Sequence, residues 1–138
     1  MLERFRHLGR ERQSLLIEAI CELTLASASV ALLPFRRAIV RGSRPLSSAR
    51  RTPATIETVI WAVEAAARRM PWRTVCIEQG LAAQRMLRRR GIDARLHYGA
   101  RNDHSAGKLE AHVWVTVDGV PVIGESEAGR FAEIAAYP

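Results

Sequence analysis

The sequence predicts an α+β domain in which helices come first and a small antiparallel sheet follows. Apolar residues recur at helical spacing in three stretches before Gly91, and beyond it apolar and polar residues alternate as they do in strands. An Asp118-Gly119 dipeptide, which favours a two-residue hairpin turn, separates two of the alternating segments. These observations together favour helices packed on a hairpin-built sheet.

Composition indicates one folded domain. The 138 residues suffice for one hydrophobic core, so we interpret residues 1–138 as a single domain. The net charge of +7 comes almost wholly from arginine, which suits an acidic peptide, an acidic partner protein or nucleic acid. Aromatic residues are few and no recognition motif is present, so we expect no nucleic-acid partner.

The two cysteines, Cys21 and Cys76, are too few for a disulfide scaffold, and the charged N-terminus does not resemble a secretory signal. We therefore expect a protein of the cytoplasm. The apolar run over residues 15–33 is interrupted by Glu18 and Glu22, so we expect no membrane span. Cysteines and histidines lack the spacing of metal ligands, and we expect neither a metal nor another cofactor.

The first predicted helix runs from residue 11 to about residue 33 and carries one buried apolar stripe. Cys21 lies beside that stripe, and we interpret it as a packing residue. An arginine-rich connection over residues 35–51 follows. Residues 1–51 are therefore expected to form a helical N-terminal part with a basic connection.

The core is expected to occupy residues 52–138 and to begin with the second helix. Thr52 can cap that helix, and Pro53 suits its first helical position. An apolar stripe continues the helix to about Arg69, and Pro71 then stops it.

A third helix is predicted from about residue 74 to Arg90, where Gly91 supplies the usual terminating residue. One narrow stripe of this helix contains small residues, so another element can approach it closely. The stripe consists of Cys76, Gly80, Ala83 and Leu87. The residues expected to face outward are Arg85, Arg88 and Arg89.

Alternation predicts the strands after Gly91. The first strand covers residues 94–98, and residues 101–108 are expected to form a polar loop. A second strand over residues 111–117 and a third over residues 120–125 flank the hairpin turn.

Cys76 and His112 are the candidate catalytic residues. Cysteine hydrolysis needs a thiolate, an imidazole that shares its proton, and a polar group that orients the imidazole. Cys76 lies in the first turn of its helix, where unpaired N–H groups favour a negative charge. His112 shares one strand face with Trp114, whereas the opposite face is wholly aliphatic. This pattern indicates a site on the polar face.

A hairpin turn of two residues places Trp114 opposite Ile123 and His112 opposite Glu125. Glu125 can then accept a hydrogen bond from the imidazole and fix its tautomer, which makes it the expected third catalytic residue. A bulge on the returning strand would instead bring Glu127 to that place.

Asp118 is a less favourable candidate for the acid, because a side chain at the hairpin tip is remote from the strand centre. The remaining histidines lack the setting of His112, and we interpret them as surface residues. They are His7, His97 and His104.

Two motifs carry a family resemblance. The stretch CIEQGLAAQRMLRRRGI over residues 76–92 and the stretch AHVWV over residues 111–115, followed by Asp118-Gly119, resemble the transglutaminase-like cysteine peptidases of lasso peptide biosynthesis. The resemblance covers residues 71–125. It implies a papain-like or transglutaminase-like fold, in which the helix that bears the nucleophile packs on a small antiparallel sheet.

The resemblance implies a function and partners. Such enzymes remove the leader from a ribosomally made precursor peptide, and a cyclase then closes the macrolactam on the freed core amine. A separate small recognition protein usually holds the leader and docks on the peptidase. We therefore expect the precursor peptide as substrate, the recognition protein as a partner subunit and the cyclase as a further partner.

The same resemblance assigns the nucleophile to Cys76 and the base to His112. The family's acidic residue is commonly Asp, and here Glu125 stands in its place. The backbone N–H of Cys76 is expected to contribute to the oxyanion hole. The residues expected to line the substrate site are Trp72, Gln79 and Trp114.

Two other functions are compatible with these residues. The same constellation supports transglutamination, deamidation or acyl transfer to an amine. A noncatalytic module that binds a peptide or nucleic acid through its arginine-rich segment is the alternative from another class. Loss of activity in Cys76→Ala would separate an enzyme from such a module.

Overall fold

The computed structural model describes residues 3, 6–34, 37–38, 53–74, 76–103, 107–124 and 132–137. Its main helices and strands are α2 (Arg10–Leu32), α4 (Pro53–Ala67), α5 (Cys76–Arg89), β1 (Ala94–Asp103), β2 (Lys108–Val117), β3 (Val120–Ile123) and β4 (Ala132–Tyr137). Helices precede the strands along the chain, which confirms the α+β prediction.

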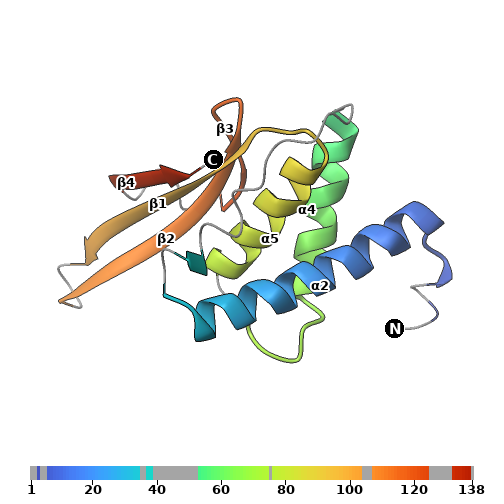
Figure 1. Cartoon of the computed structure of the whole chain (residues 1–138), viewed down its shortest axis with the longest axis horizontal. Helices are drawn as coiled ribbons and strands as arrows, with labels where there is room; N and C mark the ends of the chain where they lie inside the picture. Colours follow the sequence, from blue (N-terminus) through green and yellow to red (C-terminus); the bar gives the residue numbers. More distant parts are fainter. Residues whose placement is uncertain are drawn as a thin grey trace.

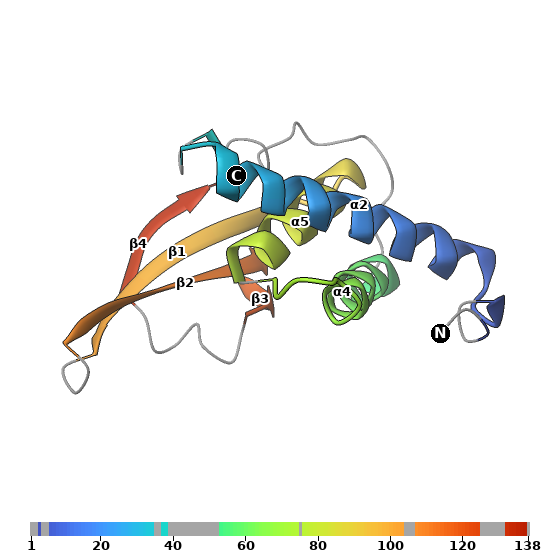
Figure 2. The same ribbon diagram turned by 90° about the horizontal axis from the view of Figure 1, so that it is seen from below.

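The helices lie on one side of a four-stranded sheet (Figures 1 and 2). The strand order is β3-β2-β1-β4, and every neighbouring pair is antiparallel. α5 packs on β1 and β2, and α2 packs on both α4 and α5. The helix that begins with Cys76 is therefore the central element, because it contacts both the sheet and the helical layer.

The small residues of α5 allow it to lie close to the sheet. A Cβ atom on Gly80 would stand 2.9 Å from Val113 Cγ1 and 3.0 Å from Leu96 Cδ1, which leaves no room for a side chain. Ala83 and Leu87 are fully buried on the same stripe. The predicted close approach along this stripe is confirmed, and it sets how near α5 lies to the sheet.

The arginines of α5 are held by acidic residues and do not all face solvent. Arg85 pairs with Glu22 at 3.0 Å, and Arg88 pairs with Asp93 at 2.9 Å and is itself buried. Arg89 contacts both Glu18 and Glu22. The prediction that Arg85, Arg88 and Arg89 face outward is wrong, because α2 packs over this part of α5.

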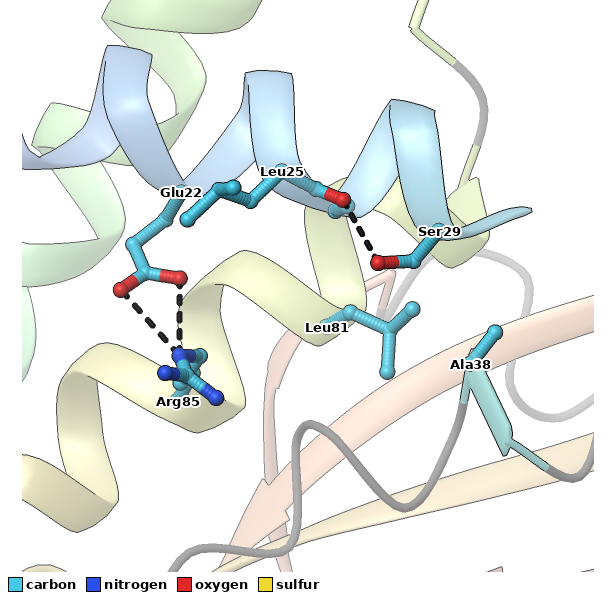
Figure 3. Close-up of a pocket in the computed structure, with 7 residues that line it drawn as sticks. Glu22, Leu25, Ser29, Ala38, Leu81 and Arg85 are labelled. Carbon is cyan, nitrogen blue, oxygen red and sulfur yellow. Dashed lines mark hydrogen bonds and ion pairs between the residues drawn. The ribbon is translucent and has the colours of Figure 1, made fainter. Parts of the chain in front are cut away.

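Figure 3 shows Glu22 of α2 pointing toward Arg85 of α5, next to a cavity of about 10 Å³. That volume holds about one water molecule, so the cavity is a packing feature. Arg90 joins the network through Glu18 Oε2 at 2.5 Å. Burial disfavours the charged form of Glu18, but the hydrogen bonds and charges of Arg90 and Arg89 outweigh it and lower the pKa of Glu18 below its ordinary value.

By length and composition alone, α2 could cross a membrane, as the core helix of many globular folds also could. In this structure its inward face is buried, with Leu16, Ala19 and Leu23 against the other helices. Glu18 and Glu22, which interrupt the apolar run, pair with α5. These contacts give α2 the role of a packed helix in the domain.

The three predicted helices are confirmed to within a few residues at each end, and Pro53 begins α4 as expected. Thr52 lies outside the described residues, as does most of the arginine-rich connection. Because nothing here tests the division at residue 51, it stays a prediction.

The sheet is larger than predicted. β1 continues to Asp103 and β2 begins at Lys108, so only residues between them can form the loop that was expected over residues 101–108. β4 was not predicted, and it pairs with β1 from Leu96 to Ala100. Its sequence, AEIAAY, is alanine-rich and carries little of the β-branched character that predicts a strand.

Candidate active site

Cys76 is the first residue of α5, at the end of the helix that approaches β2 (Figure 1). Its side chain is a half-buried free thiol that packs against the hydrophobic core. Pro71 cannot continue α4, and a short connection follows before the chain turns into α5. The N–H groups of the first turn are unpaired within the helix, so they can stabilise negative charge on or near the thiol.

His112 lies on β2, half-buried, and two contacts fix its ring. Nε2 is 3.3 Å from the carbonyl oxygen of Gly124, and the ring stacks on Trp114 with centroids 6.4 Å apart. A carbonyl oxygen only accepts, so the contact requires the proton on Nε2. Nδ1 is then the basic nitrogen of the neutral ring, as a general base requires.

Trp114 is buried between two histidines. Its other stacking partner is His97 of β1, with ring centroids 5.5 Å apart and planes 8° from parallel. His97 Nε2 lies 2.6 Å from the hydroxyl oxygen of Thr116. The interpretation of His97 as a surface residue is therefore wrong: His97 is half-buried and braces the tryptophan that supports His112.

The two faces of β2 have different roles. The side chains of Val113 and Val115 lie against Gly80 and therefore face α5. His112 and Trp114 alternate with them along the strand and therefore face the opposite side of the sheet. Cys76 stands one helical turn before Gly80, and His112 is next to Val113 in sequence. Cys76 thus begins the helix that packs against one face of β2, and His112 lies on the opposite face of the same strand.

Among the described residues, no hydrogen bond joins the Cys76 thiol to the His112 ring. Catalytic hydrogen bonds are often long in free enzymes and tighten when substrate binds. The two groups thus lie on neighbouring elements, α5 and β2.

Gly124 is a functional residue that the sequence analysis missed. Its φ of +74° is a conformation that side chains rarely adopt, and an added Cβ would stand 2.9 Å from Val113 O and 3.3 Å from His112 Nε2. Only glycine lets the carbonyl approach the histidine in this way. A glycine opposite the histidine strand, directly before an acidic residue, was the available signal.

The predicted register next to His112 is wrong. Ile123 pairs with Val115 and not with Trp114, because the register shifts between Val115 and Thr116. The observed register therefore does not place Glu125 opposite His112. Glu125 and Glu127 lie outside the described residues, so their positions stay predictions.

The hairpin turn itself is confirmed. Asp118 has φ 51° and Gly119 has φ 78°, as a type I′ turn requires. Asp118 is exposed and lies six residues beyond His112 along the strand, or about 20 Å. It is therefore remote from the candidate base, as expected.

The three residues expected to line the substrate site have different positions. Trp72 is exposed, and its indole N–H donates to Ser27 Oγ of α2 at 3.0 Å, so it ties the α4–α5 connection to α2. Gln79 donates to Thr74 Oγ1 at 3.1 Å beside Cys76. Trp114 is buried under His112. Gln79 and Trp114 lie next to the candidate catalytic residues, and Trp72 is directed toward α2.

In the described part of the chain, no three His, Cys, Asp or Glu side chains gather as ligands of a metal ion would.

A family model described as the transglutaminase-like superfamily matches residues 19–136, a span that includes both Cys76 and His112. The chain belongs to the transglutaminase-like superfamily. No curated protein and no solved structure matches the chain significantly. Transglutaminase-like domains are typically those of cysteine hydrolases and acyl transferases, so membership implies cysteine-dependent acyl chemistry. It leaves the substrate open.

Proposed function

We propose that this chain is a cysteine peptidase that removes the leader from a ribosomally made lasso precursor peptide. One observation carries the proposal: in a transglutaminase-like domain, Cys76 begins the helix that packs on the strand bearing His112. The likeness of residues 76–92 and 111–115 to lasso leader peptidases supports the choice of substrate. The precursor is made by ribosomes, so we place the reaction in the cytoplasm.

The proposed reaction proceeds in two acyl transfers. The Cys76 thiolate attacks the carbonyl carbon of the scissile amide, and the backbone N–H of Cys76 stabilises the oxyanion. The C–N bond breaks as the His112 imidazolium gives its proton to the leaving amine, which frees the core peptide. The leader stays on Cys76 as a thioester.

Water completes the cycle. His112 takes a proton from the water as it attacks the thioester carbonyl, and it returns that proton to the departing thiolate. The leader leaves with a new carboxylate. If an amine replaced water, the same site would perform transamidation, which is the main competing reaction.

Glu125 is the proposed acidic residue of the site, next in sequence to the glycine whose carbonyl accepts from His112. Its role is to stabilise the imidazolium that forms after the first proton transfer. Glu127 is the alternative acid.

We also propose that a separate recognition protein presents the leader and that a cyclase receives the freed core. A peptidase that recognises its substrate through a partner needs few contacts of its own with the leader. Cleavage should then depend on both proteins.

The test is mass spectrometry of a candidate lasso precursor incubated with this protein, with and without its recognition protein, and with Cys76→Ala. The expected result is cleavage at the leader–core junction by the parent together with the recognition protein, and no cleavage by Cys76→Ala. An intact precursor in every sample, despite folded protein and demonstrated leader binding, would refute the leader peptidase function. Formation of a leader amide on addition of a primary amine would indicate transamidation.

A further inference from the structure

An open cleft of about 260 Å³ lies at the start of α5. It is lined by Glu64, Ala67, Arg68, Arg73, Thr74 and Gln79. These residues come from the end of α4, the α4–α5 connection and the first turn of α5. Thr74 and Gln79 flank Cys76 in the sequence, so the cleft adjoins the proposed nucleophile.

Two arginines give the cleft its charge. Arg68 and Arg73 are exposed, and neither is paired with a carboxylate among the described residues. Among the described residues, by contrast, every arginine of α5 pairs with an acidic residue. These arginines are Arg85, Arg88 and Arg89, and Arg90 directly after the helix pairs with Glu18. The fold thus pairs the arginines of α5 with acidic residues and leaves Arg68 and Arg73 on the wall of the cleft.

The wall beside Cys76 also offers a neutral donor. Gln79 Nε2 donates to Thr74 Oγ1 at 3.1 Å and to the Thr74 carbonyl oxygen at 3.4 Å. Because the hydroxyl oxygen accepts from Gln79, its own hydrogen can point elsewhere and donate. Two guanidinium groups and a hydroxyl donor suit a carboxylate, whose oxygens only accept.

Glu64 lines the same cleft and opposes one of the two positive charges. With Arg68, Arg73 and Glu64 all ionised, the cleft keeps a net positive charge. The acidic group also narrows the choice of ligand, because it disfavours a polyanion such as nucleic acid and allows a single carboxylate.

We propose that this cleft is a substrate subsite that binds an acidic side chain of the precursor peptide close to the bond that Cys76 attacks. The proposal rests on the proposed function in taking Cys76 as the nucleophile and the precursor peptide as the substrate. The subsite selects Asp or Glu near the cleavage junction, in addition to any contact that a recognition protein makes with the leader.

The first test compares two alkylating reagents at Cys76. Iodoacetate and iodoacetamide react by the same displacement of iodide by Sγ, but only iodoacetate carries a carboxylate. Cys21 is exposed, so the assay uses a Cys21→Ser background and follows Cys76 by peptide mass spectrometry. The measured quantity is the ratio of the iodoacetate rate to the iodoacetamide rate.

Arg68→Gln/Arg73→Gln is expected to lower this ratio roughly three- to tenfold, as two exposed ion pairs allow. Raising the salt concentration to about 0.5 M should lower the parent's ratio in the same direction. The matched control is Arg10→Gln, which removes an exposed charge at the far end of α2 and should leave the ratio unchanged. An unchanged ratio in the double variant, or a Cys76 that reacts with neither reagent, overturns the proposal.

The second test uses the precursor. Each Asp or Glu of the precursor near the junction is changed in turn to Asn or Gln. One of these changes is expected to raise KM about tenfold with the parent enzyme. With the Arg68→Gln/Arg73→Gln enzyme, the same change should leave KM unaltered. Equal KM effects with both enzymes would refute the subsite. A normal alkylation ratio without any precursor cleavage would instead refute the peptidase function and leave the anion-binding cleft in place.

Discussion

The His112 ring contacts the Gly124 carbonyl oxygen through Nε2 and stacks on the Trp114 indole. Gly124 O accepts from Nε2, and Trp114 stacks on the ring and is itself braced by His97. The setting of the base thus depends on residues outside the catalytic pair.

Gly124→Ala tests that setting. The added methyl group would meet Val113 O and His112 Nε2 and displace the ring, and we expect kcat/KM for precursor cleavage to fall about 10- to 100-fold. Gly107→Ala is the control, because Gly107 also has a positive φ but nothing within 4 Å of its added Cβ. Both variants should lose about 1 kcal/mol of stability from backbone strain.

Activity is compared at equal folded fraction, which circular dichroism measures. A folded Gly124→Ala with parental kcat/KM would show that the Gly124 carbonyl does not position the base.

The positions of some site residues were predictable from the sequence, and those of others were not. Pro71 and Gly91 bracket the third helix, so the place of Cys76 at its start was predictable. The stack of His97 on Trp114 joins residues from two strands, and the contact of Trp72 with Ser27 joins the α4–α5 connection to α2. Such contacts depend on packing that periodicity does not contain.

Among the elements, α2 and α5 are joined by an ion network on one side of the hydrophobic core. Glu18 and Glu22 face Arg85, Arg89 and Arg90 across the helix contact. Sequence periodicity identified both helices but could not show which side of α5 meets α2. For that reason it assigned paired arginines to solvent.

Glu18→Gln is expected to lower the free energy of unfolding by about 1 kcal/mol at pH 7. The folded-state pKa of Glu18 is lowered, so its contribution is present above the unfolded pKa of about 4.3 and is lost as the pH falls through the folded value. The difference from the parent should therefore shrink as the pH is lowered below about 4.

Urea unfolding of both proteins at pH 7 and at low pH measures this difference. Glu57→Gln is the matched control, because Glu57 is an exposed residue of α4 outside the network. The same destabilisation of Glu18→Gln at both pH values would contradict an electrostatic role for Glu18.

For the whole molecule, the fold class was predictable and the sheet topology was not. Helical and alternating periods occur in separate parts of the chain, and that separation defines an α+β domain. β3 and β4 stand at opposite edges of the sheet, an arrangement that no local pattern encodes. A register shift next to Thr116 likewise changed the predicted partner of Ile123 from Trp114 to Val115.

The arrangement of the layers places the chemistry. α5 lies between the helical layer and the sheet, so the start of α5 meets β2 at one end and the Arg68–Arg73 cleft beside it. The start of α5 thus carries the thiol, and the positively charged cleft is lined by residues on both sides of that thiol in the sequence. A peptide bound there would have its scissile carbonyl near Cys76.

The most direct test of the central claim is the capture of the acyl-enzyme. The parent is mixed with precursor and recognition protein, quenched in acid within the first turnover and analysed by intact-protein and peptide mass spectrometry. We predict an adduct with the mass of the leader acyl group on Cys76, equimolar release of core peptide, and neither product from Cys76→Ala. Cleavage by Cys76→Ala, or an adduct on any other residue, would contradict the assignment of Cys76 as the nucleophile.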